Sequence, residues 1–465
     1  MTLRPPEGGK ARGENLLSRL FSDYGIVLAL VLLCIYFSWA TYTEQHPVGV
    51  DAGAQLAREI TSAISKVHSN GGGFVFIVAG DSREDANFAR QLTADVESRR
   101  ITVVDTVLGT PADARRAIDR YSDSEPPIDY IATSETASRW AVFDNLASRG
   151  IAFSSARVVS PEPYRGSNFL TTTNLLNIAN QIAVIAIIAI GMTLVIITGG
   201  IDLSVGSLIA LSAVAATLLV RDFGGAESAT AWALTACSLA GIFLCGALGL
   251  VTGSLVALIR IPAFIVTLAM MLVASGIAFI LAKGQSIYQV PDSYVWLGRG
   301  ADVGIPNAVL MTLVLYAAAH LFLTRTAPGR HIYAVGANQE SARLSGVPVK
   351  RILVFVYTVS GLLAGLGGVV MASQLKSGSP TYGQMYELYV IAAVVVGGTS
   401  LAGGQGKVFG TLIGALIIAV IQNGMNLIGV ESYTQKVVLG LVILGAVVLD
   451  QFKRGGGIRL RLGRA

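Results

Sequence analysis

Apolar segments long enough to cross a bilayer recur along this chain, and they decide its fold class. About 20 apolar residues span a membrane as a helix. The chain of 465 residues is 53% hydrophobic and only 14% charged, which is typical of a polytopic membrane protein rather than a soluble one. Besides a first segment at 25–42, the sequence predicts nine spans, at 177–199, 203–220, 230–259, 262–282, 306–324, 352–373, 387–402, 408–428 and 434–450. We expect an all-α membrane protein of about ten transmembrane helices.

The basic residues predict how these spans are oriented. With a cytoplasmic N-terminus, sixteen Lys and Arg fall on the cytoplasmic side and five in the short outer connections, as the positive-inside rule requires. Four of the sixteen precede the first span without a cleavage site behind it, so that helix is expected to be retained. The predicted parts are 1–23, a cytoplasmic N-terminal segment; 24–43, the first transmembrane helix; 44–166, an inserted α/β periplasmic domain; 167–452, the transmembrane domain; and 453–465, a basic cytoplasmic tail.

The eighth predicted span is the least regular. Its C-terminal part is rich in glycine, with Gly397, Gly398, Gly403, Gly404 and Gly406 close together. The sequence therefore leaves open a re-entrant or broken helix that lines a cavity.

One acid interrupts two otherwise apolar lengths, and a lone carboxylate at membrane depth is costly. Asp202 follows Gly199 and Gly200 and precedes Ser204. The pattern predicts a helix that stops at the glycines and restarts with Asp202 or Ser204 as its cap. The alternative to a functional acid is a plain turn between two spans, with Asp202 facing water.

The polar stretch 44–166 has an alternating strand and helix rhythm, which predicts a small parallel sheet covered by helices on both faces. Strands are expected at 74–79, 101–107 and 128–132. Thr110 and Pro111 begin one helix. Ser134 or Thr136 is expected to cap another helix, which carries Ala137, Trp140, Ala141 and Leu146.

The sequence contains no clear motif for catalysis or for binding a cofactor. The three cysteines, Cys34, Cys237 and Cys245, lie in apolar runs, and none of the four histidines is near a cysteine or a paired carboxylate. The nearest approach to a phosphate-binding loop, LAGGQGKV at 401–408, lacks both the first glycine and the Ser or Thr that would bind magnesium. If ATP drives this protein, another chain binds it.

Three motifs resemble one known family. They are TGGIDLSVGS at 198–207, YAVGAN with ARLSG at 333–346, and IAAVVVGGTSLAGGQG at 391–406 followed by GTLIG and NGMN. Together they are similar to the permease subunits of monosaccharide ATP-binding-cassette importers of the ribose, xylose and arabinose type. The resemblance covers about 167–452 and the first helix.

The resemblance implies a function and a set of residues. It implies a transporter subunit that is no enzyme, binds no cofactor or nucleic acid itself, and lies in the bacterial inner membrane. Its implied partners are the lipid bilayer, a second permease copy, a periplasmic sugar-binding protein, and a cytoplasmic ATPase that holds ATP and magnesium. The implied coupling helix, which docks on that ATPase, is carried onto Ala337, Asn338, Ser341, Ala342, Leu344 and Gly346. Signature or pathway candidates are Gly199, Gly200, Asp202, Ser204, Gly206, Asn423 and Asn426.

The inserted domain resembles, more weakly, one lobe of a periplasmic sugar-binding protein. Ser134 and Glu135 stand where that family usually has Asn-Asp, and 80–85 lies where a lobe could touch a ligand. A matching arginine is missing. Two roles stay open: docking or packing on the transporter, and receiving or sensing a ligand.

Two other classes of function remain as alternatives. One is an ion-coupled secondary transporter in which Asp202 and Glu387 handle the ion, because intramembrane acids often serve that way. The other is a membrane receptor whose domain 44–166 senses a ligand, against which the absence of a recognisable signalling domain after Asp450 argues.

Overall fold

The computed structural model describes residues 16–67, 72–123, 125–144, 146 and 149–455. They form two compact units. The inserted unit is Tyr42–Asn168, and the membrane unit is made of the chain on either side of it. Most of the predicted N-terminal segment 1–23 and of the tail 453–465 lies outside the described residues, although helix α1 begins at Leu16 and α17 ends at Gly455.

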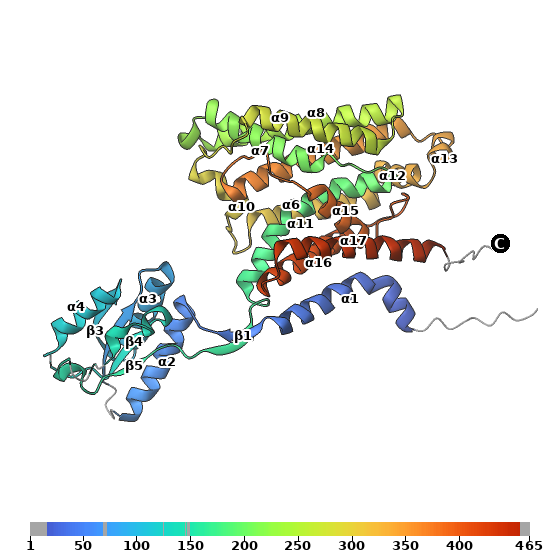
Figure 1. The fold of residues 1–465 in the computed structure, drawn as a ribbon. Helices are drawn as coiled ribbons and strands as arrows, with labels where there is room; N and C mark the ends of the chain where they lie inside the picture. The colour runs from blue at the N-terminus through green and yellow to red at the C-terminus, as the bar shows by residue number, and fades with distance from the viewer. Residues whose placement is uncertain (1–15, 68–71, 124, 145, 147–148, 456–465) are drawn as a thin grey trace, which may run out of the picture. The chain divides into compact units, whose positions relative to one another are not determined.

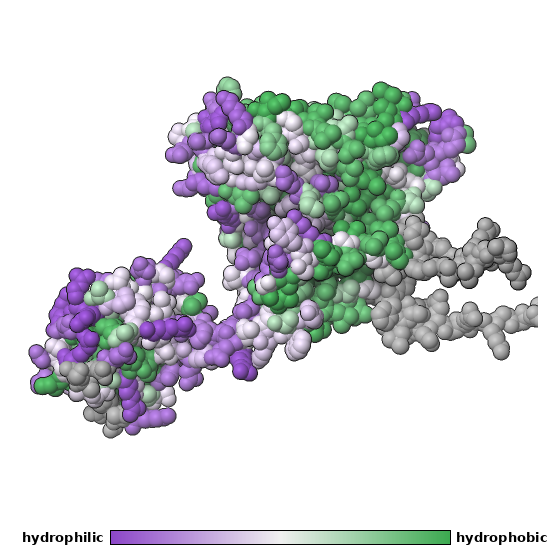
Figure 2. Space-filling model, in the orientation of Figure 1, coloured by the Kyte–Doolittle hydropathy of each residue, from purple (hydrophilic) through white to green (hydrophobic). Residues whose placement is uncertain are grey.

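The membrane unit is a bundle of long apolar helices that run side by side (Figure 1). Among the described residues, seven helices are long and apolar enough to cross a membrane, and three apolar helices are shorter. Figure 2 shows hydrophobic residues covering a broad band of this unit, with hydrophilic residues at its two ends. The seven are α6 (Thr172–Ile197), α7 (Val205–Asp222), α8 (Ala231–Ser254, extended by a π turn at Leu255–Ile259), α9 (Ala263–Ala282), α11 (Asn307–Arg325), α14 (Val349–Leu375) and α16 (Val408–Leu427). The three are the Gly25–Ala40 part of α1 (Leu16–Ala40), α15 (Tyr386–Val396) and the Ser432–Val448 part of α17 (Ser432–Gly455).

Helix α6 lies at the centre of this unit. Every residue from Ile182 to Thr198 is buried, which is expected only of a helix surrounded on all sides. Helix α14 packs against it and against α8 through small residues. A Cβ on Gly361 of α14 would lie 2.4 Å from the carbonyl oxygen of Cys245 in α8, so glycine is needed for the two backbones to approach.

The predicted eighth span, 387–402, is wrong as a continuous helix. Helix α15 ends at Val396 after 11 residues, and a loop follows before α16 begins at Val408. Gly398 follows the C-cap residue Gly397 with φ +85°, a left-handed conformation that ends the helix, and Gly403 and Gly404 are also left-handed further along the loop. The broken-helix alternative therefore describes this segment.

Four parallel strands form the sheet of the inserted unit, in the order β3-β2-β4-β5. Strand β2 (Phe74–Ala79) has the predicted bounds, whereas β3 (Thr102–Leu108), β4 (Tyr130–Thr133) and β5 (Arg157–Val159) are shifted or were not foreseen. Helices α2 (Gly49–Val67) and α3 (Arg83–Glu97) cover one face, and α4 (Pro111–Tyr121) covers the other. The chain enters and leaves through an antiparallel pair, β1 (Tyr42–Gln45) and β6 (Tyr164–Ser167).

The long helix predicted after Ser134 is wrong. Ser134 does cap a helix, but α5 is only Glu135–Ser138, and a short 3-10 turn at Ala141–Phe143 follows. The buried positions here are Ala137, Val142 and Leu146, a spacing that one regular helix cannot bring to one face. Ala141, which the prediction placed on the apolar face, is exposed.

Candidate functional site

Asp202 lies in the break between α6 and α7, and it is buried, with 2% of its surface exposed. Its Oδ1 accepts hydrogen bonds from the backbone N–H and the hydroxyl of Ser204, at 3.0 and 2.6 Å. Its Oδ2 accepts one from Ser360 of α14, at 2.8 Å. The alternative of a turn whose acid faces water is therefore wrong. Because a buried carboxyl group needs hydrogen-bond partners, these bonds fix the break against α14.

The break has the predicted form with one difference in its cap. Helix α6 ends at Ile197, and Ser204 is the N-cap residue of α7. The Ser204 hydroxyl bonds to Asp202 rather than to the helix. Thr267 of α9 donates a hydrogen bond to the carbonyl of Ile201 at 3.3 Å, so the break is attached to α9 as well as to α14.

Gly200 is required by a close approach rather than by its own backbone conformation. A Cβ at this position would lie 2.3 Å from Tyr357 Oη. Tyr357, in α14, is 1% exposed, and its hydroxyl has no hydrogen-bond partner in the described part of the chain. Neither Tyr357 nor Ser360 was identified from the sequence.

The glycine junction, which we define as Ile197, Gly336 and Gly404, joins three segments distant in sequence. Gly404 donates a backbone hydrogen bond to the carbonyl of Ile197 at 2.8 Å. Gly336, in α12 (Ala327–Ala337), packs so closely that a Cβ would lie 1.7 Å from the same carbonyl oxygen. Tyr333 adds a hydrogen bond to the Gly406 carbonyl at 2.8 Å. Helix α12 is thus anchored to the end of α6 and to the loop after α15.

The segment to which the resemblance assigns coupling contains a short helix, α13 (Gln339–Leu344), directly after α12. Asn338 caps it as predicted, accepting a hydrogen bond from the Ser341 N–H at 2.8 Å. Gly346 ends the segment with φ +83°. Ala337 is the last residue of α12, and Leu344 is 74% exposed, so α13 presents an apolar side chain outward.

Ala342, which the resemblance assigns to the coupling helix, is buried. It is 5% exposed and belongs to the core of the membrane unit, whereas Ser341 and Ser345 are exposed. The reason is local: the Val347 N–H bonds back to the Ala342 carbonyl at 3.0 Å, and the left-handed Gly346 turns the chain over it.

A cavity of 480 Å³, the α13 cavity, separates α13 from the α6–α7 break. Gly199, Gly200 and Tyr357 line it on one side, and Arg260, Arg343 and Lys350 bring positive charge to the other. Arg343 pairs with Glu340, its Nε lying 3.0 Å from Oε2, and this pair holds the pKa of Glu340 below its usual range.

Asn423 and Asn426 form contacts between segments. Asn423 of α16 and Asn174 of α6 exchange side-chain hydrogen bonds at 2.9 and 3.1 Å. Asn426 accepts one from Gln435 of α17 at 2.7 Å. Both residues were expected as family-signature or pathway candidates, and the geometry favours a role in hydrogen bonding between helices.

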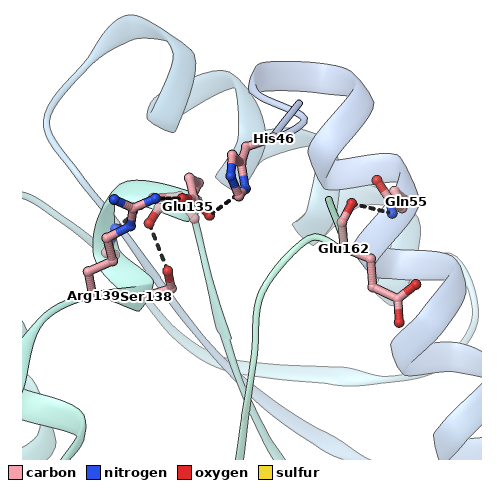
Figure 3. Close-up of polar contacts among 8 residues, drawn as sticks. His46, Gln55, Glu135, Ser138, Arg139 and Glu162 are labelled. Atoms are coloured by element: carbon pink, nitrogen blue, oxygen red, sulfur yellow. Dashed lines mark hydrogen bonds and ion pairs between the residues drawn. The ribbon is translucent and has the colours of Figure 1, made fainter. Parts of the chain in front are cut away.

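In the inserted unit, the carboxyl ends of β2 and β4 are covered by the chain itself. Ligands of open α/β sheets bind at this edge. Here Pro47, Val48 and Gly49 lie over Ser82, Ser134 and Glu135, and the cavity left is 30 Å³, room for about one water molecule. Figure 3 shows His46 and Arg139 both contacting Glu135, with His46 Nδ1 3.3 Å from its Oε2. Nearby, Gln55 bonds to the Glu162 carbonyl at 3.1 Å.

Within the described residues, no group of three or more His, Cys, Asp and Glu side chains could hold a metal ion. Loop 401–407, the nearest approach to a phosphate-binding loop, packs against the end of α6 and α12.

The chain is similar to known sugar permeases over about three fifths of its length. It is 47% identical to the ribose import permease of Escherichia coli over 291 residues, which are 62% of this chain and 88% of that protein. It is 37% identical to the D-allose transport system permease of Escherichia coli (61% and 85% covered) and 38% identical to the L-arabinose ABC transporter permease of Azospirillum brasilense (62% and 82% covered).

No solved structure matches the chain. Residues 174–447 match the family described as branched-chain amino acid transport system / permease component. The resemblance predicted from the three motifs is thereby confirmed, and this chain belongs to that family of transport permeases, in which its relatives include permeases of sugar importers.

Proposed function

We propose that this chain is the membrane-spanning permease subunit of an ATP-binding-cassette importer that carries ribose or a related monosaccharide across the bacterial inner membrane. The observation that carries the proposal is the exposed, capped α13 in a chain that is 47% identical to a ribose import permease over 291 residues. The family description mentions branched-chain amino acids, but the relatives named above transport sugars.

The chain crosses the membrane ten times in this proposal, with seven long and three shorter apolar helices, and both termini are cytoplasmic. That orientation places α13 with its basic neighbours Arg343 and Lys350 in the cytoplasm. The inserted unit, 44–166, is then periplasmic. Because its strand edge is filled by Pro47–Gly49, its role in this proposal is to dock a separate sugar-binding protein rather than to bind the sugar.

The mechanism is alternating access without bond chemistry on this chain. Two permease copies enclose the pathway, and two cytoplasmic ATPase subunits hold ATP and magnesium. Helix α13 follows α12, which the glycine junction anchors to the end of α6. A displacement of α13 by the ATPase therefore reaches the α6–α7 break through packed backbone, where no side chain can absorb the movement.

Leu344 gives the sharpest test of this proposal. The Leu344→Glu variant puts a charge on the outward face of α13, and Val303→Glu is its control, because Val303 is 70% exposed in the loop before α11. The tagged proteins are purified in mild detergent from the native host, and the co-purified proteins are identified by mass spectrometry. Uptake of labelled ribose is then measured in proteoliposomes with ATP.

The wild type and Val303→Glu are expected to retain an ATPase subunit and ATP-driven uptake. Leu344→Glu should lose both at least about tenfold, since one desolvated charge costs more than 1.4 kcal/mol, while its thermal unfolding stays unchanged. Full retention by Leu344→Glu would refute the role of α13. A wild-type chain that purifies alone and transports with an ion gradient would instead establish the secondary transporter.

A further inference from the structure

A second cavity, the α9 cavity of 320 Å³, lies across the α6–α7 break from the α13 cavity. Gly206 and Ser207 line it, whereas Thr198 to Gly200 line the α13 cavity. Helix α9 passes both, with Ala263 at the α13 cavity and Met271, Leu272 and Ser275 at the α9 cavity. The segment between the cavities, 201–204, is the one that Thr267 and Ser360 hold by hydrogen bonds.

The α9 cavity lies beside the chain between α14 and α15, which is made mostly of turns and runs back along α7. A Cβ on Gly378 would lie 2.0 Å from Thr217 Oγ1, and a Cβ on Gly383 would lie 2.5 Å from the Gly206 carbonyl oxygen. Residues 206 to 217 cover about 16 Å of helix. Helix α15 therefore begins beside the first turn of α7, deep in the unit. Short, interrupted spans of this kind line substrate sites in other transporters.

Four polar side chains that line this cavity have no partner on another residue in the described part of the chain. Within the described residues, the side chains of Ser207, Ser275, Gln384 and Glu387 make no hydrogen bond or ion pair to another residue, and the Glu387 carboxylate bonds only to its own backbone. Other serines of the unit are satisfied: Ser212 bonds to the Gly365 carbonyl, and Ser254 to that of Leu250. A carboxylate inside a membrane unit is costly without a ligand or water to solvate it.

We infer that the α9 cavity is a binding station for the transported sugar, in which Glu387 accepts hydrogen bonds from its hydroxyls and Gln384, Ser207 and Ser275 complete the set. The inference rests on the proposed function and supplies its substrate site. The volume is at the lower end of the range for small-molecule sites, about 300–1,000 Å³, which suits a monosaccharide. Met271, Leu272 and Tyr382 provide the apolar lining.

The test uses the complete importer in proteoliposomes, with the permease, its ATPase and its sugar-binding protein. Initial uptake is measured for ribose and for 2-, 3- and 5-deoxyribose, with Glu387→Gln, Gln384→Ala and Ser275→Ala. The matched controls are Glu227→Gln, at an exposed loop position of the same unit, and Ser254→Ala, on α8. For each sugar, the initial uptake rate of the variant is divided by that of the wild type. The sugar preference of the binding protein then cancels from the ratio.

Glu387→Gln should lower ribose uptake about 10- to 100-fold, as for the loss of hydrogen bonds to a charged group. One deoxy sugar lacks the hydroxyl that Glu387 binds. For that sugar, the uptake rate of the variant should be close to the uptake rate of the wild type. ATP hydrolysis stimulated by the loaded binding protein should persist, because α13 is untouched.

Equal losses for all four sugars, or none for ribose, would refute the station while leaving the importer intact. A wild-type complex that takes up none of these sugars with ATP would refute the proposed function instead. The two failures are therefore distinguishable in one assay.

Discussion

The unpaired hydroxyl of Tyr357 determines which residue can stand at position 200. It is buried beside Asp202, yet that acid bonds to Ser204 and Ser360 instead. The hydroxyl occupies the space that a side chain at position 200 would need. The glycine in the family motif is thus explained by a residue about 160 positions away, which no local pattern could reveal.

Gly200→Ala is expected to destabilise the membrane unit by about 1–3 kcal/mol, since the new Cβ would meet Tyr357 Oη at 2.3 Å. Tyr357→Phe alone should be neutral or stabilising, because that hydroxyl has no partner. In the Tyr357→Phe background most of the penalty should vanish, since the next contacts of the Cβ are 3.2 and 3.4 Å. The measurement is a double-mutant cycle: thermal unfolding in detergent of the wild type, the two single variants and the double variant. A penalty of equal size in both backgrounds would contradict the steric explanation.

At the scale of elements, apolar length predicted the straight helices well. The segments 262–282 and 408–428 agree with α9 and α16 to within one residue, because both are uninterrupted spans. The prediction failed at α15, which ends at Val396 just before the left-handed Gly398. It also failed after Ser134, where the buried residues follow no helical period.

The candidate site was predicted in part. Asn338 is visible from the sequence because a cap is a contact between near neighbours. The contacts of Asp202 with Ser360, and of Ile197 with Gly404, join positions more than 150 residues apart. These contacts depend on how the helices pack against one another. Neither the hydrophobic periodicity nor the motifs of the sequence contain that information.

The glycine junction predicts a strong effect of one methyl group. Gly336→Ala places a Cβ 1.7 Å from the Ile197 carbonyl oxygen and 2.6 Å from the Gly404 nitrogen, so it must break the hydrogen bond between them. We expect a loss of about 2–4 kcal/mol from overpacking and the broken bond together. Sugar-stimulated ATP hydrolysis and uptake should also become uncoupled.

Gly276→Ala is the control for that change, because a Cβ at Gly276 of α9 would meet nothing within 4 Å. It should leave thermal unfolding and uptake unaltered or raise stability slightly, as alanine favours helices. If both variants behave alike, the junction is no obligatory connection between α12 and α6.

At the scale of the whole molecule, the two units are joined in a way that allows separation. Within the membrane unit, Thr41 Oγ1 accepts a hydrogen bond from the Phe169 N–H at 3.1 Å, so the chain leaves and returns at one place. The inserted unit closes on itself through the pairing of Tyr42 with Ser167. Each unit also has its own hydrophobic core. Such an insertion is expected to be removable.

A chain in which Gly-Gly replaces Tyr42–Asn168 should therefore fold and retain ATP-driven ribose uptake at saturating binding protein. Its half-saturating concentration of binding protein should rise several-fold, because the lost unit docks that partner in the proposed function.

The isolated unit should show a folded circular dichroism spectrum. It should show no heat of ribose binding in calorimetry, since the cavity at its strand edge is only 30 Å³. Ribose binding by the isolated unit would assign it a sensing role, and an unchanged half-saturating concentration would exclude docking. The result decides whether the insertion delivers the partner or the sugar.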